Sequence, residues 1–119
     1  MKKLLLFTLV CFASALSFGQ KVANTSAESL KSGKTSGNYT FVMPSDVTAA
    51  EVDGVKNYYK QYFTVTMDEK KHELTVNLVN KDETSVRVIN RLMVSLEVSD
   101  FSVAGSEMTF DEMFEKYMK

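Results

Sequence analysis

The side chains in this sequence that could bind copper without a thiolate are one imidazole and six thioethers. His72 is the single histidine, and the methionines after the initiator are Met43, Met67, Met93, Met108, Met113 and Met118. Thioether sulfur and imidazole nitrogen are both copper ligands, but methionine more often fills irregular gaps in a hydrophobic core. We therefore expect no bound metal, and Met43 and His72 are the residues from which a copper site would be built.

The residues that could take part in catalysis do not form a recognisable motif. A serine nucleophile would have to use His72, and no serine stands in a nucleophile-turn motif. Gly33-Lys34-Thr35 resembles the end of a phosphate loop, but Glu28 stands where that motif needs a glycine. The acidic residues near the C-terminus have the spacing of a solvated helix face: Glu107, Asp111, Glu112 and Glu115. The sequence therefore predicts a non-catalytic protein without a cofactor.

Residues 1–19 have the three-part layout of a bacterial secretory signal peptide. Lys2 and Lys3 give a positive start, and an apolar run over residues 4–12 is followed by small residues. The run is too short to span a bilayer, which takes about 20 residues. We expect cleavage after Gly19, with Ala15 as the competing site, and export to the periplasm or out of the cell.

Cys11, the only cysteine, lies within this signal. A lipoprotein would carry its lipid there, but Val10 stands where such sites prefer a small residue. Otherwise Cys11 is removed, and the mature chain has no disulfide. Loss of Lys2 and Lys3 leaves 12 basic and 15 acidic residues, a net charge of −3. That balance argues against a nucleic-acid partner and against adhesion to anionic membranes.

The mature chain is long enough for one domain. Residues 20–38 are rich in Ser, Thr, Gly and Lys, so we predict a disordered linker there and a folded domain over residues 39–119. The domain is expected to open with a strand over residues 39–43, ended by Pro44. A helix capped by Ser45 or Asp46 follows, to about residue 61.

Period-two alternation predicts a β-hairpin from residues 63–67 and 72–79. A core-facing stripe predicts a second helix that ends near residue 96, and a strand with a bulge near Asp100 follows over residues 97–104. Thr109 has the capping-box spacing for a last helix over residues 110–118. The order β-α-β-β-α-β is that of an α+β, ferredoxin-like sandwich, and we expect the appended C-terminal helix to pack on the same domain.

The order and lengths of these segments resemble the heavy-metal-associated domain of copper chaperones and metal-pumping ATPases. The resemblance covers residues 39–104 and rests on "YTFVM" as the first strand, "YFTVTMDEKKHELTVNLV" as the central hairpin and "DETSVRVINRLMVSL" as the second helix. In that family a Cys-x-x-Cys pair at the start of the first helix binds a soft metal ion. The matching residues 44–49 contain no cysteine, so the resemblance implies the fold and not metal transfer.

We therefore expect an exported, non-catalytic binding domain with a protein or peptide partner. Its contact surface is expected to combine the loop after the first strand with neighbouring tyrosines, because tyrosine is enriched at interfaces. These residues are Pro44, Ser45, Asp46, Tyr58, Tyr59 and Tyr62. The alternative is a periplasmic copper-handling protein that uses methionine and histidine ligands.

Overall fold

The computed structural model describes residues 21–119, and the expected signal peptide, its cleavage site and Cys11 lie outside the described residues. The described chain is an α+β fold, which confirms the predicted class. Its strands are β1 (Lys21–Thr25), β2 (Asn38–Val42), β3 (Phe63–Asp68), β4 (Glu73–Leu78), β5 (Val98–Val103) and β6 (Ser106–Met108). Its helices are α2 (Ala27–Ser36), α3 (Ala49–Lys56), α4 (Glu83–Ser95) and α5 (Phe110–Met113), with a 3₁₀ turn η1 (Asn57–Tyr59) and a π-helical turn η2 (Phe114–Met118).

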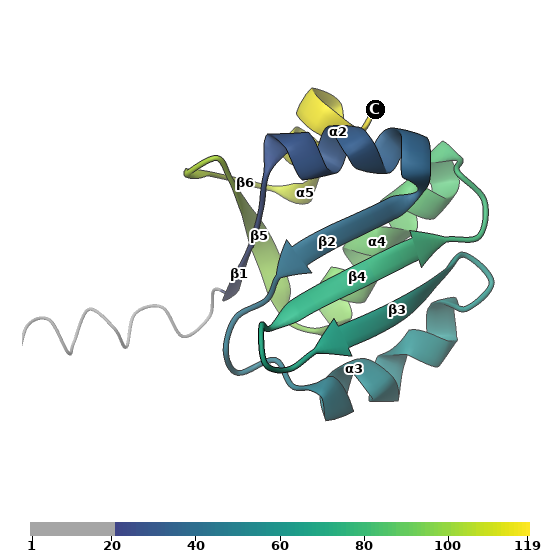
Figure 1. Cartoon of the computed structure of the whole chain (residues 1–119), viewed down its shortest axis with the longest axis vertical. Helices are drawn as coiled ribbons and strands as arrows, with labels where there is room; N and C mark the ends of the chain where they lie inside the picture. The colour runs from purple at the N-terminus through teal and green to yellow at the C-terminus, as the bar shows by residue number, and fades with distance from the viewer. Residues whose placement is uncertain (1–20) are drawn as a thin grey trace, which may run out of the picture.

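The strands form one mixed sheet in the order β3-β4-β2-β1-β5-β6 (Figure 1). Only β1 and β5 are parallel, and the other neighbours are antiparallel. β3 and β4 form the predicted hairpin. The pairing of β1 with β5 shifts where Val22 faces Asp100, so the predicted bulge in this last long strand is confirmed.

The prediction of a disordered linker over residues 20–38 is wrong for the described part, because residues 21–36 form β1 and α2. Their few apolar side chains are placed inward, and Ala23 and Leu30 are fully buried. The Ser26 side chain caps α2 by accepting from the Ser29 N–H at 3.0 Å. Gly37 ends it with φ of +81°, a conformation that favours glycine. Low apolar content did not prevent folding, because β1 has hydrogen-bonding neighbours on both sides.

The strand order also differs from the plain four-stranded sandwich, in which the first and last strands are neighbours. Here β1 lies between β2 and β5, so the crossover from β4 through α4 to β5 passes two strands. Figure 1 shows α4 behind the sheet and the face formed by β2, β4 and β3 toward the viewer without a helix on it. The helices therefore gather on one side of this sheet.

The hydrophobic core lies between that covered face and the helices. Phe41 and Phe101 meet edge to face with ring centroids 6.0 Å apart, and Phe101 meets Phe110 in the same way at 5.8 Å. Phe114 of η2 is buried beside Phe110. Thr109 and Glu112 form the predicted capping box. The C-terminal helix thus packs within the domain, as expected. Within residues 21–119, no helix has the length and hydropathy needed to cross a bilayer.

Candidate functional site

The loop after β2 mainly serves to start α3. The Val47 N–H donates to the Pro44 carbonyl at 3.0 Å, and Thr48 forms a capping box with Glu51. The cap is therefore Thr48, and the prediction of Ser45 or Asp46 as the cap is wrong. A Thr-x-x-Glu pattern satisfies two free N–H groups reciprocally, a signal that the sequence contains.

Asp46 is engaged in an ion-pair network at this end of the sheet. Lys21 Nζ lies 3.3 Å from an Asp46 carboxylate oxygen and 3.2 Å from one of Glu97. The hydrogen bond that Lys21 donates to Glu97 is the main cause that raises the pKa of Lys21; desolvation opposes it and Asp46 adds to it. Lys21 thereby ties the start of β1 to the loop and to the turn before β5. Of the predicted contact residues here, Ser45 and Asp46 are exposed and Pro44 is half-buried.

Met43 and His72 are brought together by the backbone. The Met43 N–H donates to the His72 carbonyl at 2.7 Å, and His72 turns the chain into β4 with φ of +55°. The Met43 side chain is only 3% exposed and belongs to the core. Within residues 21–119, no three His, Cys, Asp or Glu side chains converge in a way that could hold a metal ion.

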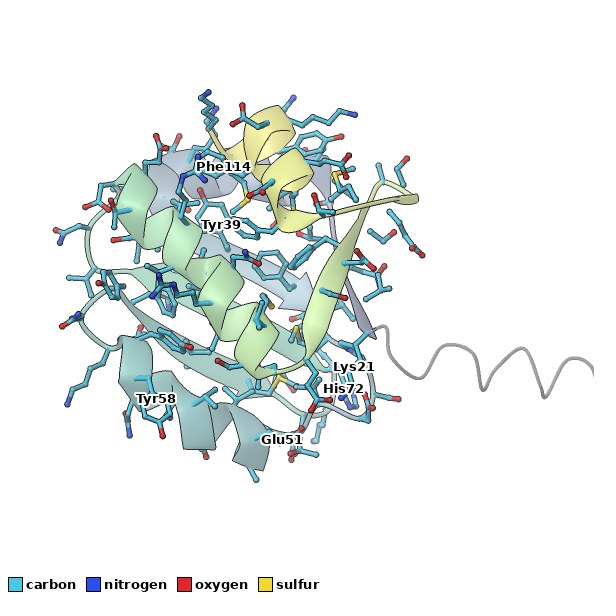
Figure 2. All side chains as sticks on the ribbon, turned by 180° about the vertical axis from the view of Figure 1, so that it is seen from behind. Lys21, Tyr39, Glu51, Tyr58, His72 and Phe114 are labelled. Atoms are coloured by element: carbon cyan, nitrogen blue, oxygen red, sulfur yellow. The ribbon has the colours of Figure 1, made fainter. Side chains whose placement is uncertain are left out.

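The predicted tyrosines lie at the other end of α3 from this loop. Residues 44–46 precede the first turn of α3 and Tyr58 follows its last, about 12 Å away along an eight-residue helix. Figure 2 shows His72 and Glu51 toward one end of the sheet and Tyr58 well apart from them. Tyr58 is 75% exposed. The Tyr59 hydroxyl lies 2.7 Å from the Ser95 hydroxyl, which fixes it to α4.

The outer edge of the sheet near these tyrosines is formed by β3. Tyr62 accepts a hydrogen bond from the Val79 N–H at 2.9 Å. Bonded pairs of an antiparallel ladder recur at every second residue, so Thr64, Thr66 and Asp68 bond to β4. The backbone groups that point away from β4 belong to the residues between them: Phe63, Val65 and Met67.

An aromatic series connects this edge with solvent. Phe63 is buried and stacks on Tyr59 at 5.8 Å, and Tyr59 meets the exposed Tyr58 at 6.4 Å. A hollow of about 170 Å³ lies beside the start of β3. Its lining residues are Lys56, Asn57, Lys60, Phe63, Thr64 and Val65. Of the three residues with outward-pointing backbone groups, Phe63 and Val65 are buried and Met67 is half-buried. Half-buried Tyr62 packs against the core.

A half-open cavity at the opposite end of β2 was not predicted. It has a volume of about 230 Å³ between α2, the start of α4 and η2, and Tyr39 and Phe114 both line it. Figure 2 labels these two residues at the same end of the sheet. Gly33 and Lys34, which resemble a phosphate loop in the sequence, lie inside α2 and line this cavity. No local signal marks the cavity, because its walls come from segments that are distant in sequence.

The fold and these sites define a small α+β domain with a sheet edge at β3 and a half-open cavity beside Tyr39. Comparison of the chain with protein-family models, with curated proteins and with solved structures finds no match.

Proposed function

We propose that this chain is an exported, non-catalytic domain that binds a protein partner by pairing an extended segment of that partner with the outer edge of β3. The observation that carries the proposal is the edge itself, where Phe63, Val65 and Met67 direct backbone donors and acceptors away from β4. An added strand would satisfy these groups, as in other cases of β-strand addition.

The strand itself lacks the features that block pairing at an edge, although α3 packs against it. Natural sheets blunt their edges with proline, bulges or very short strands. β3 has six residues, contains no proline and pairs with β4 without a bulge. Tyr58 exposes a large ring beside the start of the strand, where it would cover a side chain of the added segment.

The direct test is amide hydrogen exchange, residue by residue, on the chain bound to an extended peptide selected from a random library. A strand added to β3 slows exchange at Phe63, Val65 and Met67, whose N–H groups face outward. The Thr64 and Thr66 amides are already bonded to β4 and change little. A library that yields no binder, or a bound peptide that protects none of the three amides, contradicts the proposal. Protection that appears without peptide as protein concentration rises would show self-pairing instead.

A matched pair of variants separates backbone pairing from side-chain contact. Met67→Pro removes one outward N–H and keeps the ladder to β4, since Met67 does not bond to that strand. Met67→Ala removes the same side chain and keeps the N–H. We expect Met67→Pro to weaken peptide binding about tenfold more than Met67→Ala, the effect of losing one hydrogen bond of about 1.4 kcal/mol. Ser45→Lys, in the loop after β2, should leave peptide binding unchanged.

Export is part of this proposal and rests on the signal-peptide pattern of residues 1–19. N-terminal sequencing of the protein recovered from a bacterial host should begin at Gln20. Retention of Met1 would contradict export. It would not affect the proposal that β3 binds a partner segment, which has its own test.

The copper-handling alternative rests on Met43 and His72, whose backbones are hydrogen bonded. The geometry favours the first function, because the Met43 thioether is buried in the core. Titration with Cu(I) against a competing chelator separates the two functions. Stoichiometric competition that His72→Ala abolishes would support copper handling.

We also infer that the fold is an elaborated ferredoxin-like sandwich. Without β1, the long strands would follow the order β3-β4-β2-β5, with α3 and α4 in the two crossovers. A relation to the heavy-metal-associated domain remains part of this proposal. It rests on the segment order and lengths.

A further inference from the structure

The cavity between α2, α4 and η2 contains a polar group without a partner. Tyr39 is 1% exposed, and its hydroxyl makes no hydrogen bond to any group within residues 21–119. In this part of the chain, every side-chain nitrogen or oxygen that is fully enclosed has a hydrogen-bond partner. The Tyr39 hydroxyl has none, so its oxygen is not fully enclosed and faces the cavity that Tyr39 lines. A buried hydroxyl loses free energy unless something accepts or donates a hydrogen bond there.

Three cationic and two anionic side chains line the cavity: Lys34, Lys81, Lys119, Asp82 and Glu83. Both of its carboxylates are engaged: Asp82 accepts from the Ser85 N–H at 2.8 Å, and Glu83 accepts from Arg87 Nε at 3.0 Å. Lys81 Nζ donates to a backbone carbonyl, that of Thr35, at 2.8 Å. Lys34 also lines the cavity and makes no ion pair within residues 21–119.

The first turn of α4, which Asp82 caps, also borders the cavity. Glu83 and Val86 belong to that turn and line the cavity, where the helix presents the positive end of its dipole. Leu78, Phe114 and Met118 supply apolar walls. Lys119 completes the lining, and its ammonium group is paired with Glu115 at 3.2 Å. The Arg87 guanidinium lies 4.4 Å from the centroid of the Phe114 ring and holds that wall in place.

We propose that this cavity binds a small organic carboxylate, with the carboxylate held by the Tyr39 hydroxyl and the lysine ammonium groups and its apolar body seated against Val86, Phe114 and Met118. Burial raises the pKa of Tyr39, so its hydroxyl stays protonated and can donate to an anion. The volume of about 230 Å³ is below the roughly 300–1,000 Å³ of drug-sized pockets, which limits the ligand to a small molecule. This site is independent of the β3 edge.

The test is an NMR titration of the full mature chain with benzoate, phenylacetate and hexanoate. At least one should give saturable shifts at Gly33 and Leu78 and bind about tenfold more tightly than its neutral amide, because a charged partner strengthens the hydrogen bonds. Absence of saturation for all three at about 10 mM, near the weak limit of specific binding, overturns the proposal. Equal affinity of acid and amide overturns it too. Inorganic phosphate that binds as tightly would show an anion site without an apolar subsite, which contradicts the proposal.

Variants test the assigned roles. Tyr39→Phe removes an unpartnered hydroxyl, so the melting temperature should not fall while carboxylate affinity falls about tenfold. Tyr58→Phe is the matched control outside the cavity and should change neither. Lys34→Gln combined with Lys81→Gln should erase the preference for acid over amide, and Lys70→Gln in the β3–β4 turn should preserve it. Unchanged carboxylate affinity in Tyr39→Phe would assign that residue a purely structural role.

Discussion

The ring of Tyr39 lies directly against the backbone of Gly33, so closely that a Cβ on Gly33 would stand 2.8 Å from Tyr39 Cζ and nearer still to other ring atoms. Gly33 sits inside α2, where glycine normally weakens a helix. The contact explains why a glycine stands here, because α2 can approach β2 this closely only without a side chain at this position. The same contact buries Tyr39 at the base of the cavity.

Alanine substitutions at two helical glycines should therefore have opposite effects. Gly33→Ala forces the Tyr39 ring to move and should lower the free energy of unfolding by about 1–3 kcal/mol, the usual cost of overpacking. Gly54→Ala in α3 meets nothing within 4 Å and should raise it by about 0.5–1 kcal/mol. Urea unfolding of both variants checks this. Effects of the same sign would show that Gly33 does not make room for the ring.

The loop after β2 offers a second paired comparison. Thr48→Ala removes the side chain that accepts from the Glu51 N–H at 3.2 Å and should cost about 0.5–2 kcal/mol, as for other N-caps. Ser45→Ala, three residues earlier, should change stability by less than about 0.5 kcal/mol. Thermal unfolding distinguishes them. A larger effect at Ser45 would place the helix cap where the sequence pattern alone had placed it.

The C-terminal turn should contribute strongly to stability. Phe114 is buried against Phe110 and beneath Arg87, so Phe114→Ala should cost about 3–5 kcal/mol, in the range for buried aromatic residues. Lys116→Ala on the exposed side of the same turn should stay within about 0.5 kcal/mol. A small loss for Phe114→Ala, measured by chemical denaturation, would mean that this segment is dispensable and free to dock elsewhere.

The pKa of Asp82 should make the free energy of unfolding depend on pH in the acid range. Hydrogen bonds from Ser85 lower its pKa from the ordinary value of 3.8, so its contribution is present above that pH. It is lost as pH falls from 3.8 through the lower folded-state value. Asp82→Asn keeps a capping oxygen but cannot titrate there. The stability of the wild type relative to this variant should therefore fall below pH 3.8. A constant difference across the acid range would contradict the assignment.

Local patterns predicted those elements whose stabilising partners are close in sequence. The hairpin of β3 and β4 follows from alternation on both sides of a charged turn. The cap at Thr109 and the stripe of α4 follow from spacings of three and four residues. A Thr-x-x-Glu pattern also marks the helix start at Thr48, but residue type alone does not separate it from Ser45 and Asp46, which are equally good capping residues.

The sequence by itself determined the α+β class, the order of elements from residue 39 onward and the absence of thiolates from residues 44–49. Each of these depends on residue type or on periodicity within a few residues. Tertiary structure decided that residues 21–36 fold, that β1 separates β2 from β5, and that Gly33, Tyr39 and Phe114 surround one cavity. These outcomes depend on hydrogen bonds between strands and on burial against segments that are distant in sequence. A segment stabilised by such contacts shows no periodic pattern in its own sequence.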